Sequence, residues 1–178
     1  MTHSEVRQQL LALLPRLRRF SLVLTRSSDA ADDLLQAALE RALGRLDQWQ
    51  PGTHLDRWMF RIIRTVWINS QRAAAVRRTE PIEDHEDHLS ADGEGQMEAT
   101  LTLAEVREAF EALPVEQRQA LFLVCVEGYA YREAAEFLGL PIGTVISRLA
   151  RGRLALAAAM RAPRTSNVTL FRQKDAAS

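Results

Sequence analysis

The sequence has one cysteine, no long hydrophobic run and no net charge. Cys125 alone cannot form an internal disulfide, and its place in the apolar residues 120–126 predicts a buried, inert thiol. The apolar runs end well before the roughly 20 residues that a membrane-spanning helix needs. The N-terminal residues lack the basic-then-apolar pattern of a signal peptide. We therefore expect a cytoplasmic protein without direct membrane insertion.

Clusters of catalytic or metal-binding residues are also lacking. No His, Cys, Ser or paired carboxylates fall at a catalytic spacing, so we expect neither an enzyme nor a cofactor. The run HEDH at residues 85–88 contains ligand-type side chains, but adjacent positions in a flexible segment do not converge on one ion and fit no zinc spacing. A solvated charge run is the better interpretation.

The zero net charge conceals a partition along the chain. Residues 1–78 hold 13 Arg against 7 acidic residues, residues 79–99 hold 8 acidic and no basic residues, and residues 100–178 hold 10 basic and 8 acidic residues. A polyanion responds to local patches of charge, so overall neutrality does not exclude nucleic acid as a partner. The acidic segment contains few apolar anchors, which predicts a flexible linker between two domains.

The periodicity on both sides of this segment indicates an all-α fold. Apolar residues return every three or four positions, and no stretch alternates as a strand would. Pro15 either kinks the first helix or begins a second one. Residues 54–78 contain no Gly or Pro and predict a long helix, on which Arg57, Arg61 and Arg64 share one face.

The segment YREAAEFLGLPIGTVISRLARGR, residues 131–153, has the spacing of a helix-turn-helix. Gly139 can adopt the left-handed conformation of a tight turn, and Val145 and Leu149 point into the core. The side chains that remain outward are Thr144, Ser147, Arg148, Arg151 and Arg153. Hydroxyl and guanidinium groups near the start of a second helix suit base edges and phosphates in the major groove, although a solvated basic face is the simpler alternative.

The two halves together resemble the extracytoplasmic-function (ECF) sigma factors of the bacterial sigma-70 family. Region 4 of that family shares the pattern of PIGTVISRLARGR, region 2.2 is similar to DAADDLLQAALERAL, and regions 2.3 and 2.4 are similar to LDRWMFRIIRTVWINSQR. The resemblance implies region 2 over residues 1–78, the linker over 79–99, region 4 over 100–162 and a C-terminal tail over 163–178.

This resemblance implies a sigma factor that directs core RNA polymerase to promoters. Contacts with the β′ clamp helices would come from Asp33, Leu35 and Gln36. Region 4 would contact the β flap and, through the five outward side chains of the helix-turn-helix, the −35 duplex. The opened −10 element would meet Arg61, Thr65, Asn69, Arg72, Arg77 and Arg78. An anti-sigma factor is a further implied partner.

Four positions depart from the family pattern: Ala37 replaces a common Glu, Thr65 a frequent Asn, Ala130 a capping Ser and Ile146 a common Arg or Lys. The lost cap costs about 0.5–2 kcal/mol unless another group satisfies the free amides. Two alternatives stay open: a sigma mimic that sequesters an anti-sigma factor, and a repressor or response regulator with the same helix-turn-helix. The outward arginines argue against the mimic, and the lack of a βα repeat argues against the second.

Overall fold

The computed structural model describes residues 3–77 and 103–161, and all regular elements in these two ranges are helical. The first range forms α1 (His3–Thr25), α2 (Ser28–Leu43), the 3-10 turn η1 (Leu46–Gln48) and α3 (Leu55–Arg77). The second range forms α4 (Leu103–Glu111), α5 (Val115–Leu121), the π-helical turn η2 (Phe122–Val126), α6 (Tyr131–Leu138) and α7 (Ile142–Arg161). The all-α prediction is confirmed. The predicted linker, the tail and Arg78 lie outside the described residues.

Helices α1, α2 and α3 pack together as a first unit. Pro15 lies on the exposed side of α1, which continues through it as one helix. The predicted long helix is confirmed as α3, which buries Leu55, Met59, Phe60 and Ile63 against the other two helices. Among the described helices, none combines the length and the apolar character that crossing a lipid bilayer requires.

Helices α4 to α7 form a second unit, in which α5 and α7 make the most extensive contact. The predicted turn between α6 and α7 is confirmed: Gly139 has φ 68° and caps α6 in the left-handed conformation. Val145 and Leu149 are buried in the core as expected, with 0% and 2% of their surface exposed.

The prediction of a buried Cys125 is wrong. Turn η2 contains an i to i+5 hydrogen bond of 2.9 Å from the Glu127 amide to the Phe122 carbonyl. This wider turn shifts the register of the residues after it relative to an α-helix. Phe122 and Leu123 therefore face the core, whereas Cys125 is exposed.

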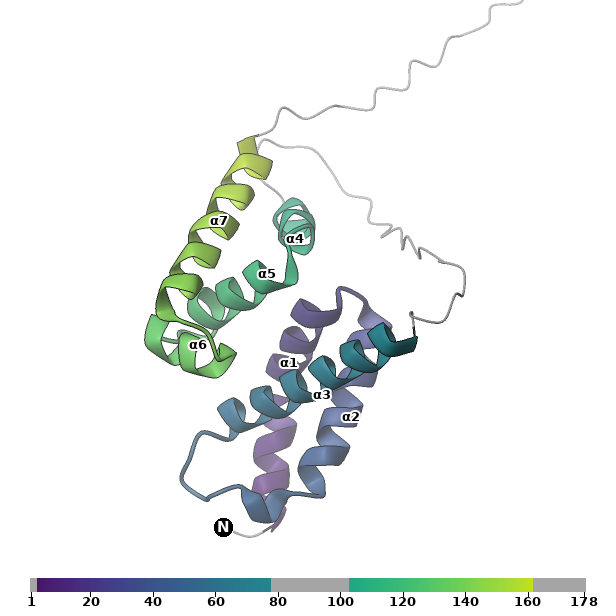
Figure 1. Ribbon diagram of the computed structural model, residues 1–178. Helices are drawn as coiled ribbons and strands as arrows, with labels where there is room; N and C mark the ends of the chain where they lie inside the picture. The colour runs from purple at the N-terminus through teal and green to yellow at the C-terminus, as the bar shows by residue number, and fades with distance from the viewer. Residues whose placement is uncertain (1–2, 78–102, 162–178) are drawn as a thin grey trace, which may run out of the picture.

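The two units lie next to each other (Figure 1). A shared aromatic cluster joins them. Phe20 of α1 lies at its centre, with ring centroids 4.9 Å from Phe60, 5.4 Å from Phe122 and 6.2 Å from Phe137. Aromatic pairs at such distances contribute beyond the area they bury. The sequence predicted two helical units, and the structure adds that they share one core.

Arginine side chains form polar contacts between the two units. Arg57 of α3 bonds Glu133 of α6 at 2.7 Å and lies 4.6 Å over the Tyr129 ring. Arg16 pairs with Glu127, whose side chain is only 2% exposed. Arg64 donates to the Leu138 carbonyl oxygen at 2.8 Å. The Arg57 and Arg64 contacts hold the start and the end of α6 against α3, and the Arg16 contact holds α1 against the residue after η2.

Candidate nucleic-acid interface

The first half of α7 presents a polar row to solvent. Ser147 and Arg151 are exposed, and Thr144 and Arg148 are half-buried beside them. Ser147 donates to the Thr144 carbonyl at 2.9 Å, and Arg151 Nε donates to the Ser147 carbonyl at 3.3 Å. These local bonds keep the two side chains along one face of the helix.

Arg153 does not belong to this row. At about 100° per residue, a position two residues beyond Arg151 lies about 200° around the helix. Its Nη2 is instead 3.6 Å from the Cys125 sulfur, on the side of η2. The structure thus brings together four of the five outward residues predicted for the helix-turn-helix and places the fifth elsewhere.

Ile146 is 46% exposed within the same part of α7, as is Ile142 one turn earlier. An exposed isoleucine among polar neighbours offers an apolar contact of the kind that a thymine methyl group can make. The departure from the family pattern at this position therefore leaves a surface side chain rather than a core one.

The missing N-cap side chain at Ala130 is partly compensated. Glu133 accepts a hydrogen bond from the Ala130 amide at 2.9 Å, which is one half of a capping box. The hydrogen bond from Arg57, followed by the one from the Ala130 amide, lowers the pKa of Glu133. One carboxylate thus caps α6 and joins it to the first unit.

A second polar row follows α3. Arg61, Thr65, Asn69 and Arg72 are spaced by four, four and three residues, so they share one face, and all four are exposed. Thr65 donates to the Arg61 carbonyl at 2.7 Å. Arg77 is exposed at the end of the helix.

Arg57 and Arg64 flank this row but are committed to the second unit. Burial, followed by the charge of Arg148, lowers the pKa of Arg64. The predicted basic face of α3 is therefore divided: Arg61 points to solvent, whereas its two neighbours hold the interface between the units. The effect of Arg148 on Arg64 also shows that the polar row of α7 begins close to α3.

A hollow of about 220 Å³ lies beside Arg61, between the end of α2 and the middle of α3. Its lining comes from both helices and from η1: Arg41, Arg45, Gln48, Trp58, Arg61, Ile62 and Thr65. Sequence reasoning missed Arg41 and Arg45. Arg41 lies in the last turn of α2 and Arg45 follows that helix, just before η1. Only the packing of these elements on α3 shows that both line the hollow with Arg61.

The predicted polymerase-binding residues lie on α2. Asp33 and Gln36 are exposed, and Gln36 donates to the Glu40 carboxylate at 3.2 Å. Leu35 is only 8% exposed and packs into the core beside these two residues, so the structure does not bring it to the surface with them. The neighbouring Asp32 is bound by Arg18 at 2.6 Å, so the two adjacent aspartates differ in their surroundings.

Two family models match the two units separately. Residues 103–156 match Sigma-70, region 4, and residues 10–64 match the Sigma2 domain of PhyR. The chain is also 37% identical over 155 residues to the ECF RNA polymerase sigma factor EcfG of Rhodopseudomonas palustris, covering 86% of this chain and 83% of that protein. The chain belongs to the ECF RNA polymerase sigma factors.

Solved structures agree with this assignment. The sigma factor RpoE of Bartonella quintana, solved in complex with the anti-sigma factor NepR, is 30% identical to this sigma factor with a TM-score of 0.69, covering 90% of this chain and 99% of RpoE. The anti-anti-sigma factor PhyR of Bartonella quintana shares the fold, with 18% identity and a TM-score of 0.52 over 86% of this chain and 49% of PhyR.

Proposed function

We propose that this sigma factor directs core RNA polymerase to specific promoters by reading the −35 element as duplex and the −10 element as an opened strand. In this proposal α1–α3 act as region 2 and α4–α7 as region 4. One observation carries it: each unit presents its own exposed row of arginine and hydroxyl side chains, on α3 and on α7. Two separate faces suit two separate DNA elements.

The α7 row suits the −35 duplex. Arginine reads guanine edges with two hydrogen bonds or binds phosphates, and serine and threonine add shorter contacts. In helix-turn-helix proteins these contacts come from the N-terminal part of the second helix. That part of α7 contains Thr144, Ser147, Arg148 and Arg151. Arg153 lies off this row and would contact a neighbouring phosphate or remain on the protein's own surface.

The hollow beside α3 suits an unstacked base of the −10 strand. Single strands are held by aromatic surfaces for the bases and by cations for the phosphates. Trp58 supplies the aromatic ring, and Arg41, Arg45 and Arg61 supply three cations around it. Asn69, Arg72 and Arg77 would continue the contact along α3, and Arg78, the next residue in the sequence, is proposed to extend it.

We further propose that an anti-sigma factor binds this protein while its two units are packed together through the aromatic cluster, which we call the closed arrangement. The closed arrangement engages Arg57 and Arg64 within the protein and places Arg148 near α3. Bartonella RpoE, which aligns over 90% of this chain, was solved with an anti-sigma factor bound. Binding to polymerase would compete with binding to the anti-sigma factor. The polymerase contacts would come from Asp33 and Gln36 on α2 and, on the β flap, from the second unit.

A sigma mimic remains the second candidate because the first unit matches the Sigma2 domain of PhyR, which is described as an anti-anti-sigma factor. Such a protein needs to bind an anti-sigma factor but not DNA. The exposed row on α7 and the cationic hollow favour the initiating sigma factor.

Paired variants test the assignment of the two faces. We expect Arg148→Ala with Arg151→Glu to abolish promoter recognition while binding to core polymerase is kept. Alanine is chosen at Arg148 because a glutamate there would sit near Arg64 and create a new contact between the units. Arg161→Glu, at the other end of α7, is the matched control for charge. Asp33→Arg with Gln36→Ala is expected to have the opposite effect, and full-strength polymerase binding by that variant would refute the clamp contact.

A further inference from the structure

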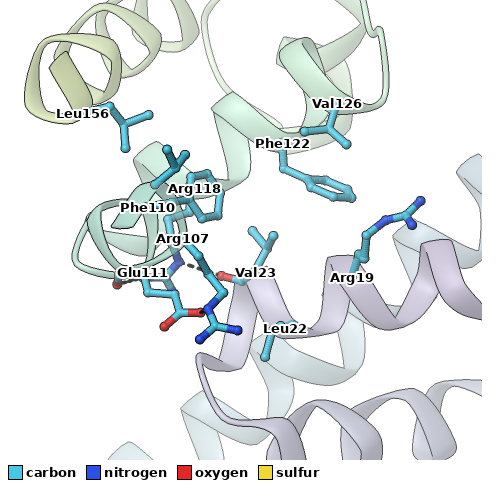
Figure 2. Close-up of a pocket in the computed structure, with 11 residues that line it drawn as sticks. Arg19, Leu22, Val23, Arg107, Phe110, Glu111, Arg118, Phe122, Val126 and Leu156 are labelled. Carbon is cyan, nitrogen blue, oxygen red and sulfur yellow. Dashed lines mark hydrogen bonds and ion pairs between the residues drawn. The ribbon is translucent and has the colours of Figure 1, made fainter. Parts of the chain in front are cut away.

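An apolar groove of about 300 Å³ lies between the two units (Figure 2). One wall is the end of α1, and the other walls come from α4, α5, η2 and α7. Its lining is almost entirely carbon, contributed by Leu22, Val23, Phe110, Phe122, Val126 and Leu156. The volume is at the lower end of the range for ligand pockets, which corresponds to a few large side chains rather than to a cofactor.

The polar groups at the groove are few and already engaged. Arg118 donates to the carbonyl oxygens of Val23 and Leu113 at 2.8 and 2.6 Å. Arg107 pairs with Glu111 at 3.7 Å at the rim. Val126 is 58% exposed at the mouth, which is a large apolar side chain left in water. An occupant must therefore be apolar and gains little from hydrogen bonds inside the groove.

We propose that the occupant is this chain's own segment at residues 168–171, Val-Thr-Leu-Phe. Helix α7 lines the groove with Leu156 and ends at Arg161, and the segment follows seven residues later. Seven residues span up to about 25 Å when extended. Returning from Arg161 to the level of Leu156 requires only about 7.5 Å along the helix axis. The chain is long enough to place Leu170 and Phe171 in the groove.

Composition separates this segment from the other chain outside the described residues. Three of the four residues 168–171 are apolar, whereas the apolar residues Ile82, Leu89 and Met97 of the acidic segment are isolated among eight carboxylates. Attachment through a short connection gives a local concentration in the millimolar range, so even weak affinity fills the groove.

Docking would fasten the two units together. The groove has α1 on one side and α4 and α7 on the other, so a segment seated in it contacts both units at once. The closed arrangement would then be stabilised by the protein's own tail. A partner that uses the same groove must displace the tail first.

Photo-crosslinking of the full chain tests this proposal without polymerase or DNA, so its outcome is separate from that of promoter recognition. Phe171→benzoylphenylalanine is expected to crosslink within one chain to peptides of α1 or α4. Thr165→benzoylphenylalanine, outside the apolar segment, is the matched control. Val126→Arg changes an exposed residue at the mouth and is expected to reduce the Phe171 crosslink to the control level while circular dichroism stays unchanged.

Two results would overturn the docking. The first is a Phe171 crosslink that joins two chains or falls outside the groove. The second is a crosslink that Val126→Arg leaves intact. Hydrogen exchange provides an independent measurement: Leu170→Asp with Phe171→Asp should accelerate exchange of the α4 amides, whereas Thr165→Asp should not. Identical α4 exchange in the double variant and the unmodified chain would also contradict the proposal.

Discussion

Gly152 lies between Arg151 and Arg153 and faces Gln117 and Leu121 of α5. A Cβ atom at this position would be 2.8 Å from Leu121 Cδ1 and 3.3 Å from Leu121 Cγ. Leu121 is 5% exposed, so its side chain has little room to withdraw. Replacing glycine by alanine inside a helix stabilises by about 1 kcal/mol, whereas overpacking a core costs about 1–3 kcal/mol. At Gly152 both effects act, and they oppose each other.

Gly143 in the same helix is the matched control because a Cβ there meets nothing within 4 Å. Helix propensity favours alanine at both positions, and at least as much at Gly152, which lies further inside α7. A lower stability of Gly152→Ala would therefore come from the steric effect. We predict that Gly152→Ala is less stable than Gly143→Ala by about 1–3 kcal/mol. Urea denaturation followed by circular dichroism measures both free energies of unfolding. If Gly152→Ala stabilised the protein as much as Gly143→Ala, the close packing of α7 on α5 would be wrong.

Three further predictions concern buried and cationic groups. Arg118→Met removes hydrogen bonds to the carbonyls of Val23, Glu111 and Leu113 and should lower the unfolding free energy by about 1.5–3 kcal/mol in urea, with a smaller loss for Arg118→Lys; equal stability of Arg118→Met and the unmodified chain would refute this. Burial raises the pKa of Tyr129 to about 12, so the neutral phenol stabilises the fold below pH 10 and this stabilisation is lost as pH rises towards 12. Across that interval the unmodified chain should lose up to about 2.7 kcal/mol of unfolding free energy relative to Tyr129→Phe. Parallel plots of unfolding free energy against pH for the two proteins would contradict this. Arg41→Ala with Arg45→Ala should lower the slope of log binding constant against log salt concentration by about 1.4 for a −10 single strand, without changing binding to −35 duplex. An unchanged slope would show that neither residue contacts the DNA.

Local pattern was sufficient to predict the helices and the turn of the helix-turn-helix. The span of α3 differs from residues 54–78 by one residue at each end, and Gly139, Val145 and Leu149 behave as expected because periodicity and turn chemistry act over a few residues. These features depend on neighbours in the chain, which the sequence displays directly.

The remaining features depend on contacts between distant segments. The π-helical turn that exposes Cys125 changes the register of one turn, and no composition signal marks it. Arg41 and Arg45 join the α3 row only through the packing of α2 on α3. The family resemblance groups Leu35 with Asp33 and Gln36, but only the packing of α2 shows that its side chain faces inward. The aromatic cluster that joins the units draws on helices separated by the acidic segment.

Run-off transcription with purified bacterial core polymerase tests whether this protein starts transcription at promoters. Genomic promoter fragments are transcribed with and without this protein, and the transcripts are sequenced. We expect discrete new start sites that share two spaced motifs and that disappear with the Arg148→Ala, Arg151→Glu variant but not with Arg161→Glu. A folded protein that binds core polymerase or an anti-sigma factor yet yields no new start site would contradict promoter recognition and support the mimic.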